Sequence, residues 1–318
     1  ARRLIDRWRD AGMEEQPEAW FTYHVYHKAP DWIGPAVSQA LNIPYFMAEV
    51  SHAPKQAGGP WDIGYRVAES AIRSADGIIG LTELDSVCVL PLLDDTGRYH
   101  RLSPFADITG LRRAAQNRDL HRKDIAERFE LPDGMPVLLA VGMMRDGDKL
   151  ASYRVLSQAL AVRTDQDWTL VIVGDGPART DVEQTFANAP PDRIRFAGAV
   201  PREDLAGFYA AADLLVWPAV NEAYGMALLE AQATGLPVIA GDTGGVPDVV
   251  HHGETGLLCP VGDAAMFADA VKMLLEAPDL RDDFSRNALA RTAAENDISA
   301  AAEALNRILQ GSRKARAA

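Results

Sequence analysis

The chain has 318 residues, of which 47% are hydrophobic and 24% are charged, and its formal net charge is -13. These values predict an ordinary globular protein of about two domains. The acidic balance argues against a binder of nucleic acid or of an anionic membrane surface, because either would need a basic face. No apolar run reaches the roughly 18 residues that cross a bilayer and no charged and apolar leader opens the sequence, so we predict a cytoplasmic protein.

The first part of the sequence alternates between two kinds of segment. Apolar and aromatic runs predict strands at 20–25, 43–50, 77–82 and 99–103. Helical segments are predicted before and between them, at 2–12, 32–41, 61–74 and 83–93. This alternation is typical of βαβ units on a parallel sheet, so residues 1–115 are predicted to form a Rossmann-like domain. The charged run 109–123 is interpreted as a linker, or as a helix that leads out of this domain.

The same alternation restarts near Met135. Strands are predicted at 136–141, 169–173, 194–196, 214–217 and 237–240, each followed by a helical segment. Residues 116–296 are therefore predicted to form a second doubly wound domain, which would bind ligands beyond the carboxyl ends of its strands. Closing helices are predicted at 264–275, 280–296 and 298–309, and residues 297–318 are predicted to be a separate C-terminal helical segment.

The stretch from Asn221 to Pro260 carries the clearest chemistry. An apolar strand at 213–218 ends at a proline, and the helix predicted over 226–233 stops at a glycine. Glu222 lies in the loop between them, and Glu230 lies on the helix. Free amides at the start of that helix favour an anion such as a diphosphate, and Glu230 can accept hydrogen bonds from the hydroxyls of a ribose. A solvated helix that carries two acids is the alternative.

Together with three other segments, this stretch resembles the signature of retaining glycosyltransferases of the GT-B type, in family 4. The segments, in the family's order and at about its spacing, are Val137–Gly142, Leu170–Pro177 and Arg195–Val200, which precede the stretch, and Thr255–Leu258, a further motif within it. The resemblance implies an α/β fold of two Rossmann-like domains facing a cleft, an acceptor-side domain first and a donor-binding domain second. It also implies that the last helix can cross back to the first domain. Nothing before Trp20 matches the family's opening glycine-rich loop, so the N-terminal domain is expected to be truncated.

The resemblance also implies which residues bind the donor, a nucleoside diphosphate sugar linked to UDP or GDP. Lys149 and Arg145 would balance the diphosphate charge, although Met143 stands where the family has an arginine. The other predicted donor-binding residues are Gly174, Val200, Tyr224, Gly225, Met226, Ala227, Glu230 and Gly244. The plainer alternatives are turn glycines and surface cations.

Three residues are predicted to act on the transferred sugar. Glu222 would orient it and steady positive charge at the anomeric carbon. His24 or His27 matches the family's sugar-contacting histidine at a strand end, and which of the two does so stays open. Either can instead be a structural histidine. His52, after the next strand, occupies a second family-like position.

The resemblance therefore predicts a hexosyltransferase-type glycosyltransferase that works with retention through a front-face mechanism. No cofactor and no metal site are predicted, since no cluster has the spacing of metal ligands. The acceptor, whether a sugar, a lipid or a small molecule, stays open, and so does contact with a membrane. Two alternative functions stay open as well. One is a phosphorylase or a nucleotide-sugar epimerase of the same architecture, and the other is a truncated, non-catalytic protein that binds nucleotide.

Overall fold

The structure is a computed structural model that describes residues 1–12, 15–162 and 167–317. Its internal contacts divide the chain into two compact units. Unit 1 comprises Ala1–Ser103 together with the residues from Ser299 onward, and unit 2 comprises Pro104–Ile298.

This division falls before the predicted boundary at 115/116 because the charged run around it is helical and packs within unit 2. The run forms α5 (Thr109–Gln116) and the first part of α6 (Arg118–Phe129), and both helices contact α9 (Arg202–Ala211). The C-terminal helical segment is α13 (Ile298–Ala317), which groups with unit 1 from Ser299 onward.

The strands of unit 2 form one parallel sheet in the order β10-β9-β8-β5-β6-β7. Their bounds are β5 (Val137–Val141), β6 (Thr169–Val173), β7 (Ile194–Gly198), β8 (Leu214–Trp217), β9 (Val238–Gly241) and β10 (Gly256–Cys259). The predicted strands β5 to β9 are confirmed. The sequence did not predict β10, because this short strand has no apolar run beyond its own few residues.

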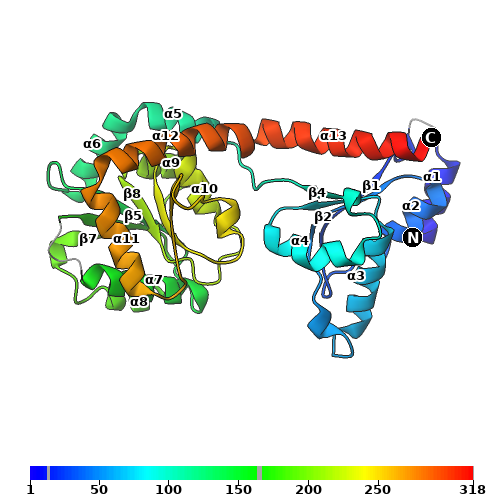
Figure 1. Ribbon diagram of the computed structural model, residues 1–318, viewed down its shortest axis with the longest axis horizontal. Coiled ribbons are helices and arrows are strands. Elements are labelled where there is room, and N and C mark those ends of the chain that lie inside the picture. Colours follow the sequence, from blue (N-terminus) through cyan, green and yellow to red (C-terminus); the bar gives the residue numbers. More distant parts are fainter. Residues whose placement is uncertain (13–14, 163–166, 318) are drawn as a thin grey trace. The chain divides into compact units, whose positions relative to one another are not determined.

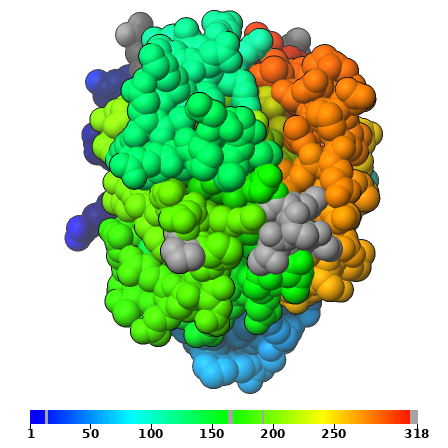
Figure 2. All heavy atoms as spheres, turned by 90° about the vertical axis from the view of Figure 1, so that its left-hand side faces the viewer, coloured from blue at the N-terminus to red at the C-terminus, as the bar shows by residue number. Residues whose placement is uncertain are grey.

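Helices cover both faces of this sheet (Figure 1). On one face lie α5, α6, α9, α10 (Met226–Ala233) and α12 (Pro278–Glu295). On the other lie α7 (Asp148–Ala161), α8 (Arg179–Thr185) and α11 (Ala264–Glu276). A space-filling view of one side of unit 2 shows α5 and α6 in teal, with α12 in orange beside them (Figure 2). Because both faces are covered, the central strands read as continuous apolar runs.

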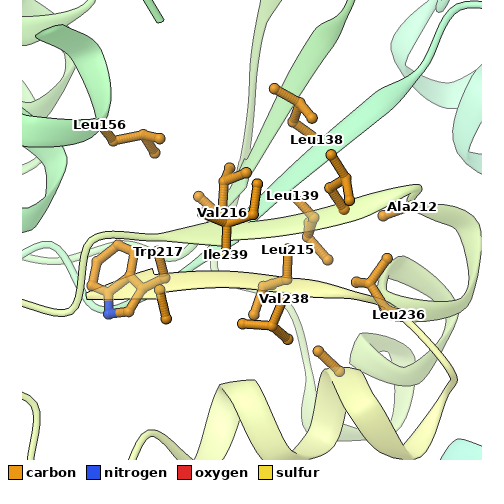
Figure 3. Packing of buried hydrophobic residues seen from close by; sticks show 14 of the residues in the cluster. Leu138, Leu139, Leu156, Ala212, Leu215, Val216, Trp217, Leu236, Val238 and Ile239 are labelled. Carbon is orange, nitrogen blue, oxygen red and sulfur yellow. The ribbon is translucent and has the colours of Figure 1, made fainter. Parts of the chain in front are cut away.

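The core of unit 2 is built on its central strands. Side chains of β5, β8 and β9 pack around Leu139, Leu215 and Ile239, which are buried (Figure 3). Trp217 ends β8, so its ring lies where the sheet's carboxyl edge begins. The packed strands therefore set the position of the loops that follow them.

Unit 1 is a smaller parallel sheet in the order β1-β2-β3-β4. Its elements are α1 (Arg2–Asp10), β1 (Trp20–Val25), α2 (Gly34–Leu41), β2 (Tyr45–Val50), α3 (Asp62–Ser74), β3 (Gly77–Gly80), α4 (Glu83–Val89) and β4 (Tyr99–Arg101). The predicted strands and their alternation with helices are confirmed. Residues of α3 pack on one face of the sheet, and Ala301 of α13 packs on Ala48 and Ile79 of the other face.

Short 3-10 turns complete the two units, at Pro54–Gln56, Leu90–Leu92, Thr96–Arg98, Pro191–Arg193 and Val246–Asp248. Within the described ranges, no helix combines the length and the apolar character needed to pass through a bilayer.

A buried carboxylate, Asp31, joins β1 and β2 of unit 1 to the start of α2. Its donors are the side chains of Trp20, Thr22 and Tyr45 and the backbone amides of Ile33 and Gly34, at 2.5 to 3.2 Å. Burial opposes ionisation of Asp31, but the hydrogen bonds from Gly34, Thr22, Ile33 and Tyr45 outweigh it and lower the pKa.

Asp31→Asn should therefore destabilise unit 1, because an amide nitrogen cannot accept from donors that already point at it. We expect a loss of about 2 kcal/mol at neutral pH. The folded pKa lies below the ordinary value of 3.8, so Asp31 stabilises the fold above that pH and the contribution is lost as the pH falls through the folded pKa. The variant should accordingly lose less stability on acidification than the parent, as measured by urea unfolding at several pH values. Asp6→Asn, an exposed change in α1, is the control and should match the parent.

Candidate functional site

A cavity of about 530 Å³ opens at the carboxyl edge of the unit 2 sheet. Its walls come from the ends of β5, β6 and β8, the loop after β7 and the first turn of α10. We call it the strand-end cavity. In a doubly wound sheet, ligands bind at this edge, in the crevice formed by the loops that follow the carboxyl ends of the strands.

Two glycines shape the loops of this cavity. Gly174 has a φ of +147°, and a Cβ there would collide with the carbonyl oxygen of Gly142. Gly225 has a φ of +73° and is the N-cap of α10, and a Cβ there would meet Leu228 Cδ1 at 2.7 Å. Backbone packing therefore requires glycine at position 174, and the left-handed backbone favours glycine at position 225.

The loop between β8 and α10 is backbone-strained. Ala219 and Asn221 have φ values of 53° and 52°, in the left-handed region that non-glycine residues seldom adopt. The start of α7 holds this loop in place: the Val220 amide donates to Ser152 Oγ at 3.0 Å, and Asn221 Nδ2 donates to Asp148 Oδ2 at 2.8 Å. Such strain persists only where the surroundings fix the backbone, and it is typical of functional loops.

The loop presents Glu222 to a lysine from α7. Lys149 Nζ lies 2.5 Å from Glu222 Oε2, and the indole nitrogen of Trp217 donates to the same oxygen at 3.3 Å. Lys149 Nζ also lies 5.3 Å from the centroid of the Trp217 ring. Both charged side chains are mostly buried, so the cavity contains a compensated ion pair above an aromatic ring.

The strand-end cavity is poor in cations. Among its described lining residues, Lys149 is the one cationic side chain. Met143 lines the cavity and is 58% exposed, whereas Arg145 is exposed outside the lining. Asp175 also lines the cavity, but its carboxylate accepts a hydrogen bond from Arg179 at 3.0 Å.

Glu230 lies beside this cavity and not in its wall. It lines a neighbouring cavity of about 540 Å³ that shares Leu205 with the first. The Tyr209 hydroxyl donates to Glu230 Oε2 at 3.0 Å. Tyr209 is buried, and that burial, then the charge of Glu230 and the hydrogen bond to it, raises the pKa of the phenol well above its usual range. The phenol therefore stays a hydrogen-bond donor at ordinary pH.

The structure brings most of the predicted donor residues together. Seven of them line the strand-end cavity: Lys149, Gly174, Val200, Tyr224, Gly225, Met226 and Ala227. Glu222, predicted to act on the sugar, lines it as well. Arg145, Glu230 and Gly244 lie outside its lining. Gly244 instead supports the Glu222 loop, since a Cβ there would collide with the carbonyl oxygen of Glu222. The binding and catalytic roles of these residues stay predictions.

The sequence did not predict a role for the two residues that donate hydrogen bonds to the glutamates. Trp217 binds Glu222, and Tyr209 binds Glu230. Each belongs to an apolar segment and therefore reads as an ordinary core residue. Their hydroxyl or indole donors are revealed only by the contacts they make.

The histidines predicted to act on the sugar lie in unit 1. His24 has a φ of 63° near the end of β1, and its Nδ1 lies 3.3 Å from Oε2 of Glu49, which has a φ of 52° in β2. The hydrogen bond to Glu49 is the main cause that raises the pKa of Tyr23 to about 12, with burial and the Glu49 charge adding to it. His24 thus lies beside a carboxylate, and both residues have left-handed backbone near a strand end.

The two other histidines have different surroundings. The His27 ring lies between aromatic rings, with centroids 5.2 Å from Tyr26 and 6.1 Å from Trp61. His52 is buried, and its Nε2 lies 3.8 Å from Oε2 of Glu69. Burial is the main cause that lowers the pKa of His52, so it favours the neutral ring. The predicted roles of His24 and His27 stay open.

A metal site would need several ligating side chains close together within the part of the chain that the structure describes. No group of three or more His, Cys, Asp or Glu side chains there is arranged to hold an ion.

Comparison with known proteins relates the chain to sugar-transferring enzymes. The family model described as glycosyl transferases group 1 matches residues 122–291. An alpha-D-kanosaminyltransferase of Streptomyces kanamyceticus is 31% identical over 241 residues, which is 74% of this chain and 60% of the relative. A 2-deoxystreptamine glucosyltransferase of the same organism is 34% identical over 65% of this chain and 53% of the relative. The chain therefore spans little more than half the length of these curated relatives.

Solved structures show the same fold. The crystal structure of Anabaena Alr3699/HepE in complex with UDP matches with a TM-score of 0.78 and 17% identity, over 98% of this chain and 81% of that one. The likeness, with the two parallel α/β units, confirms the predicted GT-B fold class.

Gly244→Ala should displace the Glu222 loop, because its Cβ would collide with the Glu222 carbonyl at a φ of +55°. Gly253→Ala is the matched control, since Gly253 has a φ of +77° and no described atom within 4 Å of a Cβ. In each variant, backbone strain should lower the free energy of unfolding by about 1 kcal/mol. The collision should lower it by about 2 kcal/mol more in Gly244→Ala. Urea unfolding would measure both, and equal losses would mean that the close approach at Gly244 carries no weight.

Proposed function

Because the chain belongs to the glycosyl transferases group 1 family, we propose that it transfers a sugar from a nucleoside diphosphate sugar to an acceptor hydroxyl, with retention, as a family 4 enzyme. The observation that carries this proposal is the Lys149–Glu222 pair, held at the start of α10 in the strand-end cavity. A cation for phosphate, helix amides for phosphate and a carboxylate for the sugar then lie within one cavity.

In the proposed complex, the diphosphate lies against the first-turn amides of α10. Helix geometry leaves the amides of the first turn without intrahelical acceptors, and α10 has no side-chain cap. Lys149 would exchange its contact with Glu222 for the phosphates, with Arg145 as a second cation from the neighbouring loop. Gly174 and Val200 would line the nucleoside side. The ribose would reach past Leu205 to Glu230, because Leu205 lines both the strand-end cavity and the neighbouring cavity that Glu230 lines.

Catalysis would rest on charge. As the diphosphate leaves, Lys149 and the α10 amides stabilise its growing negative charge, and a phosphate oxygen takes the proton of the incoming hydroxyl on the same face of the sugar. Glu222, released from Lys149, orients the sugar and steadies positive charge at the anomeric carbon. His24, which lies beside Glu49, would contact the transferred sugar, and His27 is the alternative for that contact.

Donor and acceptor are proposed at different levels of detail. Anabaena Alr3699/HepE was solved with UDP, which supports UDP ahead of GDP as the donor nucleotide. One matched relative is named for 2-deoxystreptamine, which supports a small hydroxylated acceptor ahead of a lipid.

The proposed reaction needs no resident cofactor or metal, because Lys149 and the α10 amides would stabilise the negative charge of the leaving diphosphate. Cys88 and Cys259 are free thiols, which supports a cytoplasmic, reducing location.

A thermal-shift panel of UDP, GDP, ADP and their glucose-linked forms tests the donor site. At a concentration of about 100 times Kd, a bound nucleotide should stabilise the chain by about 2.7 kcal/mol. Donor hydrolysis or transfer should then be followed for whichever nucleotide sugar binds. Binding without either reaction would favour the non-catalytic alternative, and no shift with any nucleotide would refute the donor site.

Glu230→Ala and Glu222→Ala should have different effects. Glu230→Ala removes the charged acceptor proposed for the ribose, so it should weaken nucleotide binding about 10- to 100-fold. Loss of Glu222 should lower kcat about 100-fold, while donor affinity stays the same or rises because Glu222 no longer competes for Lys149. Calorimetry and initial rates separate the two effects. Glu127→Ala, an exposed change on α6, is the control, and the assignment is wrong if both site variants behave like it.

Met143→Arg should strengthen nucleotide diphosphate binding, because it adds a second cation to a cavity with one lysine. An increase of about five- to tenfold in affinity is expected, and it should shrink at high salt. Met273→Arg adds the same charge at a similarly exposed methionine of α11. If both variants bind UDP equally, charge near Met143 does not limit binding.

A further inference from the structure

The hydrogen bond between Tyr209 and Glu230 has a geometry suited to more than stability. Tyr209 lies on α9 and is 1% exposed, and its hydroxyl meets one carboxylate oxygen of Glu230, Oε2, at 3.0 Å. Glu230 itself is partly exposed on α10. One oxygen of the carboxylate is therefore engaged from the protein interior, while the residue still lines an open cavity.

The position of Glu230 relative to the strand-end cavity defines what it can reach. Both cavities share Leu205 of α9, and Tyr209 lies one turn further along the same helix. Met226 and Ala227 of α10 line the first cavity and lie about one turn before Glu230 in the same helix. A ligand with phosphates at the start of α10 and a diol further along would thus bring the diol to Glu230.

A glutamate in such a position needs to be held. Its side chain has several rotatable bonds, and fixing it when the ligand binds costs up to about 2 kcal/mol of conformational entropy. A donor from the buried Tyr209 fixes the carboxylate in advance and leaves its second oxygen to accept from a ligand hydroxyl. Because burial keeps the phenol protonated, this donor is present throughout the ordinary pH range.

We infer that Tyr209 is a positioning residue for the ribose: it orients Glu230 so that the carboxylate distinguishes a nucleotide with ribose hydroxyls from one without them. The inference rests on the proposed function, since it takes the ligand to be a nucleoside diphosphate. It assigns to Tyr209 an effect on discrimination between ribose and deoxyribose, which a purely structural tyrosine would not have.

The test compares the parent with Tyr209→Phe, each binding nucleotides that have or lack a ribose hydroxyl. Calorimetry would compare UDP with 2′-deoxy-UDP and 3′-deoxy-UDP on the parent and on the variant, with the GDP and ADP series run in parallel. The parent should prefer the ribose form about tenfold over at least one deoxy form. Tyr209→Phe should weaken binding of the ribose form about three- to tenfold and leave that deoxy form nearly unchanged, so the preference largely disappears.

Tyr153→Phe is the matched control. Tyr153 is also a buried tyrosine of unit 2, but its hydroxyl donates to the Gly142 carbonyl at 2.7 Å, away from Glu230. Its loss should change binding of ribose and deoxyribose forms by the same factor. Thermal unfolding of both variants checks that each is folded, and Glu230→Gln should lose the preference without removing Tyr209.

The possible failures are distinguishable. Suppose that the parent binds nucleotides. If Tyr209→Phe weakens the binding of ribose and deoxyribose forms equally, or weakens the binding of neither form, the inference is overturned while the proposed function stands. If the parent binds no nucleotide of any series, the proposed function fails and the inference fails with it.

Discussion

Backbone lies against backbone at the carboxyl edge of the unit 2 sheet, with no room for a side chain between the loops. Gly174 closes on Gly142, Gly244 closes on Glu222, and Gly241 closes on the carbonyl of Pro218. Packed helices on both faces hold the strands, so the loops that leave them have little freedom to separate. The strand-end cavity is therefore built before any ligand arrives, which lowers the entropy that binding must overcome.

Charge within this cavity is sparse and already balanced. Lys149 is paired with Glu222, and Asp175 is bound by Arg179. A diphosphate would have to compete with Glu222 for Lys149, and the amides of α10 would provide much of the remaining attraction. That competition would link the two halves of the proposed reaction, since a phosphate that takes Lys149 would also free Glu222 for the sugar.

Unit 1 uses carboxylates in two opposite ways. Asp31 is buried, fully supplied with donors and lowered in pKa, as expected of a structural group. Glu49 instead lies on a strained strand end beside His24, whose side chain is 53% exposed. Hydrogen bonds to a buried carboxylate stabilise the fold. An exposed imidazole beside a carboxylate is instead suited to contact a substrate.

The sequence by itself determined the parallel α/β class and the edge at which the glycine loops and Glu222 would meet. Both follow from local rules: strand and helix periodicity is written in short windows, and the carboxyl ends of parallel strands share one edge. The resemblance of its motifs extended this to the GT-B fold. The tertiary structure decided which of these residues share a wall: Lys149 and Glu222 meet across 73 positions of the chain, while Glu230 and Arg145 fall outside the cavity. It also decided that Trp217 and Tyr209 hold the acids and that α5 packs with unit 2. Contacts between residues distant in sequence depend on the packing of whole helices and strands, which no local pattern specifies.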